Sequence, residues 1–259
     1  MNKKLWEASL NQKKNSLLYK YEQFISKKFK KKFENNFEEI LKWSIKNPED
    51  FWSSIWDFSE IKGFKSKTKI KKSKVFYKNI FLPNSKLNFA ENLLSKKNKD
   101  KAITFISENG FREEKNWHQL NANASKISEF LKKIKIQEKD RVAAYLPNCI
   151  ETVEAFIASS SLGAIWSSCS PDFGINGVIE RFSQINPKVI FVVDKYFYNG
   201  KIINVLERIP KILKAISSIK YVVIINYPGE KYQNNKNRFK KIKVFKWSEL
   251  IKTKSKNLR

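Results

Sequence analysis

Hydrophobic residues recur at helical spacing through the first hundred residues of the chain. The clearest helix start is Asn47-Pro48-Glu49-Asp50, which supplies an N-cap, a proline at the first helical position and two acids in the first turn. Residues 62–78 are basic and poorly patterned and predict a linker, whereas residues 87–94 predict one more short helix. The apolar positions of the predicted helices are Leu17, Leu18, Tyr21, Phe24, Ile25, Phe33, Phe37, Ile40, Leu41, Phe51, Trp52, Ile55, Trp56 and Phe58.

From about Lys101 the pattern changes to strands that alternate with helices. The strand runs are rich in Val and Ile without polar alternation, which is typical of a parallel sheet covered on both faces. We therefore expect an α/β fold, with a helical N-terminal cap over residues 1–98 and a mostly parallel, helix-covered sheet over residues 99–259. Strands are predicted at 102–106, 141–145, 164–166, 188–193, 221–225 and 243–245, and helices at 116–135, 150–162, 176–185, 202–209 and 247–251.

The chain has 259 residues and a formal net charge of +27, which first suggests a polyanionic partner. However, residues 140–194 carry three bases and six acids, so the excess lies in the flanks. Only six of the 52 bases are arginine, the residue favoured for bidentate phosphate contacts. We interpret the lysines as a solvated surface with no specific nucleic-acid partner. A non-enzymatic, lysine-rich module that binds nucleic acid or anionic surfaces remains the alternative.

Residue counts exclude several kinds of site. Two cysteines, Cys149 and Cys169, rule out a disulfide scaffold and suggest a reducing compartment. His118 is the single histidine, which rules out any site that needs two imidazoles, and no Gly-x-Gly pair forms a phosphate loop. No signal peptide is visible at the N-terminus, and the longest apolar stretch is too short for a bilayer span. We expect a cytoplasmic protein without a membrane partner.

A parallel sheet binds ligands at the carboxyl ends of its strands, so the loops there are the candidate site. Residues 167–174 are small and polar and could admit a nucleotide or a thiol tail, or could simply connect two elements. Lys201 follows Asn199-Gly200 and is expected to open a helix, where a phosphate would meet a cation and helix N–H groups; a solvated lysine is the alternative. Cys169 has no identifiable base and is interpreted as structural, and His118 as a packing or surface residue.

Several strings resemble the acetyl-CoA-synthetase branch of the adenylate-forming enzymes. Those that resemble its N-terminal cap are Leu5-Trp6-Glu7, residues 48–52 (PEDFW) and residues 87–94 (LNFAENLL). Those that resemble its first strands and helices are residues 140–148 (DRVAAYLPN), 154–158 (EAFIA) and 162–166 (LGAIW). The versions at 166–174 (WSSCSPDFG) and 198–201 (YNGK) look most like the acetoacetate-activating members of this family. An acetyl- or propionyl-activating member is the alternative.

The resemblance implies a two-step reaction. The carboxylate of acetoacetate attacks the α-phosphate of ATP, with Mg²⁺ balancing charge, and the thiol of CoA then displaces AMP from the acyl-adenylate. The family holds the ATP phosphates with a loop that ends in Thr-Gly-x-Pro-Lys, and no such string occurs in this sequence. We therefore expect an N-terminal part of such a ligase, inactive alone and without catalytic or metal-binding residues. It would hold neither ATP, CoA nor Mg²⁺ tightly, and a separately encoded C-terminal half is a candidate partner.

The resemblance also suggests where part of a CoA surface lies. In the acetyl-CoA relatives, the loop after the strand equivalent to residues 188–193 offers arginines to the 3′-phosphate of CoA. Here Tyr198, Gly200 and Lys201 stand near those places, with tyrosine in place of an arginine. Asp172 and Phe173, in the loop before, complete the expected CoA surface, and this loop lacks the glycine pair of the relatives.

Overall fold

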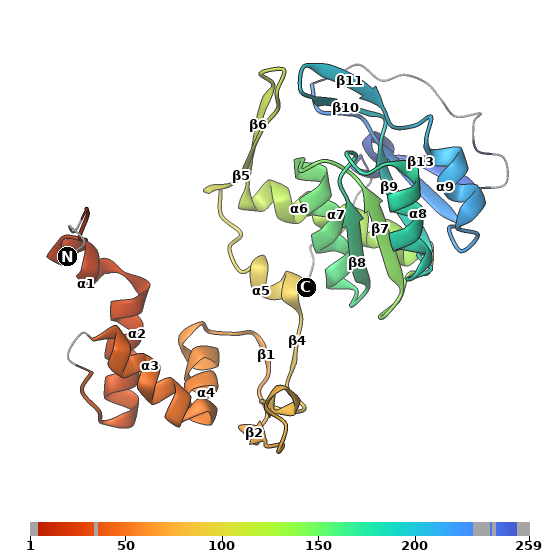
Figure 1. Cartoon of the computed structure of the whole chain (residues 1–259). Helices are drawn as coiled ribbons and strands as arrows, with labels where there is room; N and C mark the ends of the chain where they lie inside the picture. Colours follow the sequence, from red (N-terminus) through yellow and green to blue (C-terminus); the bar gives the residue numbers. More distant parts are fainter. Residues whose placement is uncertain (1–4, 34–35, 230–238, 240–241, 253–259) are drawn as a thin grey trace. The chain divides into compact units, whose positions relative to one another are not determined.

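The computed structural model describes residues 5–33, 36–229, 239 and 242–252. The chain divides into two compact units, Met1–Leu87 and Asn88–Arg259 (Figure 1).

The first unit begins with helices, as the spacing of its apolar residues predicts. Its core contains Tyr21, Ile25, Phe33, Ile40 and Trp43, all of which are buried. The ring of Trp43 packs tilted against Phe29 and edge to face against Phe33, which are favourable geometries for aromatic pairs. The helices are α1 (Leu10–Asn15), α2 (Leu17–Phe29), α3 (Phe37–Lys46) and α4 (Pro48–Phe58).

Helix α4 starts where the sequence predicts, but its details differ. Asn47 occupies the N-cap position and Pro48 the first turn, yet the Asn47 side chain makes no capping bond and its Nδ2 donates instead to the carbonyl of Trp43 at 3.1 Å. The apolar stripe is also less buried than expected, because Trp52 remains 44% exposed while Ser53 and Ser54 are buried.

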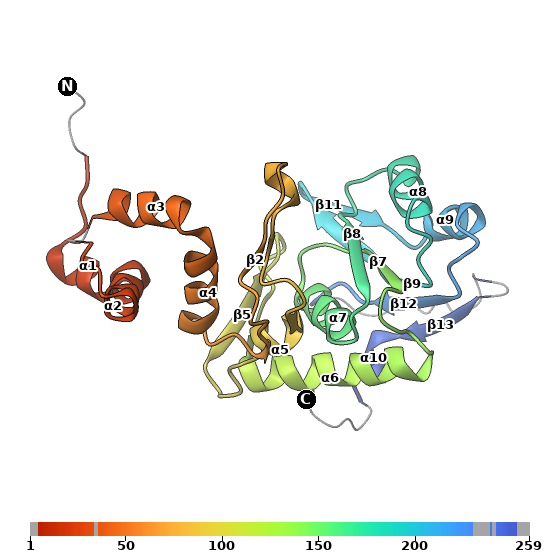
Figure 2. The same ribbon diagram turned by 90° about the horizontal axis from the view of Figure 1, so that it is seen from below.

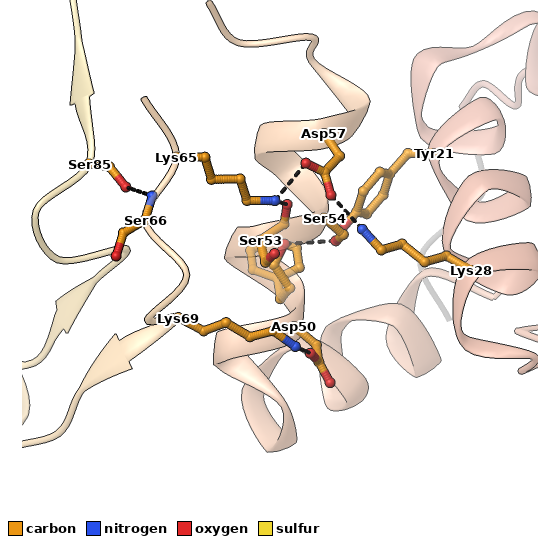
Figure 3. Close-up of polar contacts among 11 residues, drawn as sticks. Tyr21, Lys28, Asp50, Ser53, Ser54, Asp57, Lys65, Ser66, Lys69 and Ser85 are labelled. Atoms are coloured by element: carbon orange, nitrogen blue, oxygen red, sulfur yellow. Dashed lines mark hydrogen bonds and ion pairs between the residues drawn. The ribbon is translucent and has the colours of Figure 1, made fainter. Parts of the chain in front are cut away.

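Polar contacts link α4 to its neighbours within the first unit (Figure 3). Asp57 accepts hydrogen bonds from Lys28 of α2 and from Lys65, each at 2.5 Å, and Lys65 also donates to the carbonyl of Ser53. Burial opposes ionisation of Asp57, but the two ammonium groups outweigh it and hold its pKa below the usual range. The Tyr21 hydroxyl lies 2.7 Å from Ser54 Oγ and closes the contact between α2 and α4.

The stretch predicted as an unpatterned linker forms short strand pairs instead. Gly63 explains one of them, because it has φ +152° and a Cβ at this position would lie 2.3 Å from the carbonyl oxygen of Lys86. Two-residue pairs leave no hydrophobic period to detect, so the linker prediction for 62–78 is wrong in this respect. The elements are β1 (Gly63–Phe64) paired with β4 (Lys86–Leu87), β2 (Ile70–Lys71) paired with β3 (Ile80–Phe81), and the 3₁₀ turn Phe76–Lys78.

The second unit confirms the predicted parallel sheet. In the described part of the chain its strands run in the order β13-β12-β9-β7-β8, and every neighbouring pair is parallel. The central strand β9 is fully buried, which is why its sequence, VIFVV, carries no polar alternation. The sheet strands are β7 (Arg141–Tyr145), β8 (Ile165–Cys169), β9 (Val189–Val193), β12 (Tyr221–Ile225) and β13 (Lys243–Lys246).

Helices cover both faces of this sheet, as predicted. Figure 2 shows α8 and α9 on one face and α6, α7 and α10 on the other. Helix α6 begins with a capping box in which Asn116 and Gln119 satisfy each other's backbone N–H groups, and α7 is followed by Gly163 at φ +69°. The helices are α5 (Phe89–Leu93), α6 (Trp117–Lys133), α7 (Ile150–Ser161), α8 (Ile175–Ser183), α9 (Ile209–Ala215) and α10 (Trp247–Leu250).

Two antiparallel hairpins complete the second unit. The first pairs β5 (Lys101–Ile106) with β6 (Arg112–Asn116) across the predicted turn at Gly110. The second pairs β10 (Lys195–Tyr198) with β11 (Lys201–Asn204), where a helix was predicted over 202–209. Asn199 and Gly200 both have positive φ, 50° and 70°, which is the geometry of a two-residue hairpin turn. The helical prediction is therefore wrong, and α9 begins only at Ile209, followed by Pro210.

Candidate functional site

A cavity of about 390 Å³ lies in the second unit at the carboxyl ends of the parallel strands. The register pairs Tyr145 with Cys169 and Val193 with Ile225, so the loops after these strands leave the sheet at one edge. This is where open α/β sheets bind ligands. The lining residues are Phe105, Ile106, Ser107, Glu108, Leu146, Pro147, Asn148, Thr152, Ser168, Cys169, Ser170, Asp172, Tyr196, Phe197, Tyr198 and Tyr227.

One wall of the cavity is the loop that follows β8. Within it, Ser170 Oγ donates to Asp172 Oδ2 at 2.6 Å, and Tyr196 of β10 donates its hydroxyl to Asp172 Oδ1 at 2.6 Å. These hydrogen bonds hold the pKa of Asp172 below its usual range, the Ser170 hydroxyl contributing most. Burial and the adjacent Asp172 carboxylate raise the pKa of Tyr196 well above its ordinary value. Asp172 is therefore a carboxylate and Tyr196 a neutral phenol at neutral pH.

Two hairpins supply further residues of the cavity lining. Tyr198, at the end of β10, lines the cavity and is 53% exposed, so its ring stands at the mouth. The Gly200 amide donates to Glu108 Oε2 at 3.4 Å, which brings the tips of the two hairpins together. An aromatic series from Phe105 through Tyr227 to Phe197 supports them from within, with ring centroids 6.4 and 5.2 Å apart.

Only two of the five residues expected to form a CoA surface line this cavity. Asp172 and Tyr198 line the cavity, whereas Gly200, Lys201 and Phe173 do not. Phe173 instead lies under the guanidinium of Arg181, 4.3 Å from its ring centroid. Lys201 pairs with Tyr198 across the hairpin turn and begins a strand, so the expected helix N-terminus at Lys201 is wrong.

The charge on the cavity wall is negative, in contrast with the chain as a whole. Glu108 and Asp172 are the charged side chains among the residues that line it, and the remaining polar groups are hydroxyls, an amide and a thiol. A phosphate inside this cavity would meet carboxylates without a compensating cation on the wall, which is unfavourable. A neutral ligand that donates and accepts hydrogen bonds suits the cavity better.

The thiols and the imidazole are not arranged for nucleophilic catalysis. Cys149 is buried, and burial raises its pKa to about 12. Burial also raises the pKa of Cys169, which lines the cavity, and the positive charge of Arg181 offsets only part of this effect. His118 lies exposed in the first turn of α6. The interpretation of Cys169 as structural agrees with its environment, and the buried Cys149 has the same character.

Sequence reasoning missed the residues that organise the cavity from beneath. The sequence predicts Tyr145 only as part of a buried strand and Arg208 only as part of the helix over 202–209, which does not form. Both contact the loop at Pro171 and Phe173. One feature of the sequence could have pointed to Arg208. Arginine is rare in this chain, with six arginines among 52 bases, so each arginine is a candidate for a specific contact.

A second group missed by sequence reasoning is a set of buried charges between β6, α6 and α7. Glu154 is fully buried, and its Oε1 accepts from Lys115 Nζ at 3.1 Å and from Asn123 Nδ2 at 2.9 Å. Its Oε2 has no hydrogen-bond partner among the described residues. Burial raises the pKa of Glu154 to about 7, and Lys115 offsets only part of this effect.

Neither a membrane-spanning helix nor a metal-binding cluster occurs among the described residues. Among them, no helix has both the length and the apolarity needed to cross a membrane. Likewise, residues 5–33, 36–229, 239 and 242–252 contain no cluster of three or more His, Cys, Asp or Glu side chains suited to a metal ion.

Comparison with known proteins identifies the family. Residues 91–255 match the model of the family described as AMP-binding enzyme. Acetoacetyl-CoA synthetase of Xenopus tropicalis is 40% identical over 207 residues, which are 78% of this chain and 31% of that protein. Malonamoyl-CoA synthetase of Penicillium aethiopicum is 31% identical, covering 85% of this chain and 31% of the relative.

The fold gives a consistent result. Acetoacetyl-CoA synthetase from Streptomyces lividans superposes with a TM-score of 0.88 over 99% of this chain and 39% of its own, at 21% identity. The chain spans about 30% of the length of the curated relatives it matches. It belongs to the AMP-binding enzyme family and is a homologue of the acetoacetyl-CoA synthetases.

Proposed function

We propose that this chain is the N-terminal part of an acid–thiol ligase that makes acetoacetyl-CoA. In the complete reaction, a carboxylate oxygen of acetoacetate attacks the α-phosphorus of ATP and pyrophosphate leaves. The CoA sulfur then attacks the acyl carbon, AMP leaves and the thiol proton is released. Similarity to acetoacetyl-CoA synthetases over three quarters of this chain supports the assignment. Residues 1–98 would be the cap and 99–259 part of the AMP-binding domain of a cytoplasmic enzyme.

Within this reaction, we propose that the chain contributes a receiving surface for CoA. The observation that carries this proposal is the polar, acid-lined cavity at the carboxyl edge of the sheet. Its volume falls in the range of small-ligand pockets. The pantetheine arm of CoA is uncharged and carries amides and a hydroxyl, which the Ser, Asn and Tyr groups of the wall can bind. The phosphates would stay outside, where Lys201 is exposed beside Tyr198.

Binding measurements separate the two parts of this surface. Isothermal titration calorimetry of the 259-residue chain with pantetheine tests the cavity, and comparison of CoA with dephospho-CoA tests the phosphate contact. Lys201→Gln should weaken the binding of CoA several-fold, in keeping with the modest energy of an exposed charge contact. It should leave the affinity for pantetheine unchanged. Lys220→Gln is the matched control, because Lys220 is an exposed lysine at the amino end of β12. Failure of pantetheine and CoA to bind at millimolar concentration would refute the CoA surface.

A second measurement tests the expected inactivity of the chain. The sequence has no Thr-Gly-x-Pro-Lys string to hold the ATP phosphates. Electrostatic stabilisation around those phosphates supplies most of the catalysis in phosphoryl transfer. The purified chain mixed with acetoacetate, ATP, Mg²⁺ and CoA should therefore release no AMP, and substantial AMP release would contradict the proposal. Activity on co-expression with a separate C-terminal half would identify that half as the partner.

A further inference from the structure

Arg208 makes an unusual set of contacts beneath the candidate cavity. Its Nη1 donates to the Tyr145 hydroxyl at 2.7 Å and to the carbonyl of Pro171 at 2.9 Å, and it lies 3.5 Å from the carbonyl of Phe173. Arg208 is half-buried at the start of α9. One guanidinium thus reaches the end of a sheet strand and both flanks of the cavity loop.

Tyr145 completes this contact from the sheet. The residue is fully buried at the end of β7, and its hydroxyl lies 2.6 Å from the carbonyl of Phe173 and 3.2 Å from that of Pro171. The Tyr145 oxygen accepts from Arg208 and its proton goes to the nearer carbonyl. Tyr145 thus holds the carbonyl of Phe173 and Arg208 that of Pro171, so together the two side chains hold the backbone on both sides of Asp172.

This arrangement fixes the direction of the Asp172 side chain. With the carbonyls of Pro171 and Phe173 turned inward to Arg208 and Tyr145, the Asp172 carboxylate faces Ser170 and Tyr196 on the cavity wall. All the contacts of Arg208 come from Nη1, whose N–H groups have fixed directions in the plane of the guanidinium, whereas a lysine would present rotatable donors on a flexible stem and would replace the contact only in part.

We propose that Arg208 and Tyr145 are positioning residues that hold the 170–173 loop in place as a wall of the cavity and aim Asp172 at Tyr196. Their effect on CoA binding rests on the proposed function, whereas their effect on the loop does not. Neither residue touches the cavity itself, so both act through Asp172 and the loop backbone.

The first test reads the loop in the absence of any ligand. Arg208→Gln should raise amide exchange at Ser170 and residues 172–174 by about tenfold to a hundredfold, the factor for loss of a hydrogen bond from a charged donor. Arg141→Gln is the matched control. Arg141 also binds backbone carbonyls, those of Ile185, Lys139 and Asn186, but lies at the opposite end of β7. It should lower global stability without a local effect on the loop.

The titration of Asp172, followed by carbon NMR, distinguishes positioning from simple structural support. Ser170 and Tyr196 hold its pKa low, and the charge of Arg208 adds to this effect. Arg208→Gln should move the pKa of Asp172 up towards its ordinary value. Arg208→Lys restores the charge and should return the titration towards that of the parent while leaving loop exchange raised. Tyr145→Phe removes only the hydroxyl and should also raise loop exchange, so the proposal stays testable if Arg208→Gln fails to fold.

CoA and pantetheine binding to the same variants links the loop to the proposed function. Weaker binding in Arg208→Gln and Tyr145→Phe, but not in Arg141→Gln, is the expected result. If the parent chain binds neither ligand but the loop and Asp172 respond as described, the CoA surface fails and the positioning role stands. If loop exchange and the titration of Asp172 are unchanged in both Arg208→Gln and Tyr145→Phe, the positioning role is overturned.

Discussion

The buried carboxyl of Glu154 gives the sharpest prediction for stability, because its surroundings set both the sign and the size of a pH effect. Glu154 of α7 faces Lys115 of β6 and Asn123 of α6, and Glu151 on its own helix is also close enough to disfavour a second negative charge. Glu113 lies 3.5 Å from the same Lys115. Three carboxyls thus share one ammonium in a buried region, and Glu154 is the most buried of them.

The magnitude follows from the shift in pKa. Burial raises the pKa of Glu154 from 4.5 to about 7. Since the folded state holds this proton more tightly than the unfolded state, the stabilisation is fully present below the unfolded pKa. It is lost as pH rises through the folded pKa. At about 1.4 kcal/mol per pKa unit, the full effect is about 3 kcal/mol, of which about 2 kcal/mol disappears between about pH 5.5 and about pH 8.

Glu154→Gln should remove this pH dependence, because an amide accepts the same two hydrogen bonds and does not ionise. Urea unfolding of parent and variant across that pH range gives the difference in unfolding free energy, which should move in favour of the variant by about 2 kcal/mol as pH rises. Glu129→Gln is the control, since Glu129 on α6 is partly exposed and pairs with the exposed Lys132. A difference in unfolding free energy between the parent and Glu154→Gln that stays constant with pH would show that the carboxyl of Glu154 does not titrate in this range.

Three further predictions concern the second unit. Gly229→Ala should lower the unfolding free energy by about 1–3 kcal/mol in urea titrations, because Gly229 has φ +82° and a Cβ there would lie 2.6 Å from the Phe111 ring; an unchanged midpoint would contradict this. Leu131→Ala should cost about 2–5 kcal/mol in the same assay, since Leu131 is fully buried between α6 and the sheet. Cys149 should resist iodoacetamide until the chain unfolds, because its pKa of about 12 leaves almost no thiolate, and rapid labelling of the folded chain would show otherwise.

The sheet of the second unit could be predicted from sequence because its signals are local. Strand β9 reads VIFVV and is buried on both faces, and the strand predicted over 221–225 has the same bounds as β12. The start of α6 at the Asn116–Gln119 capping box and the end of α7 before Gly163 also depend on a few adjacent residues. Each of these features is determined by residues that lie close together in the sequence.

The hairpin over 195–204 shows how two local signals can compete. The apolar residues Ile202, Ile203, Val205, Leu206 and Ile209 have a spacing that a helix also permits, in keeping with the helix predicted over 202–209. Asn199-Gly200 favours a two-residue turn with positive φ at both positions, and this turn pairs Tyr196 with Ile203 across the ladder. The hairpin forms in place of the helix because its strand pairing buries Tyr196 against the cavity loop. This stabilisation comes only from the tertiary structure.

The organisation of the cavity could not be predicted, for a reason of distance along the chain. Tyr196 meets Asp172 from 24 positions away, and Arg208 meets Tyr145 from 63 positions away. Neither contact can be recognised from a short segment of the sequence. The sign of the local charge cannot be read from the sequence either. A chain with net charge +27 brings Glu108, from a hairpin turn, and Asp172, from the loop after β8, to the lining of one small cavity. Charge and ligand preference at this site are therefore consequences of topology, and the same composition on a different strand order would favour a different ligand.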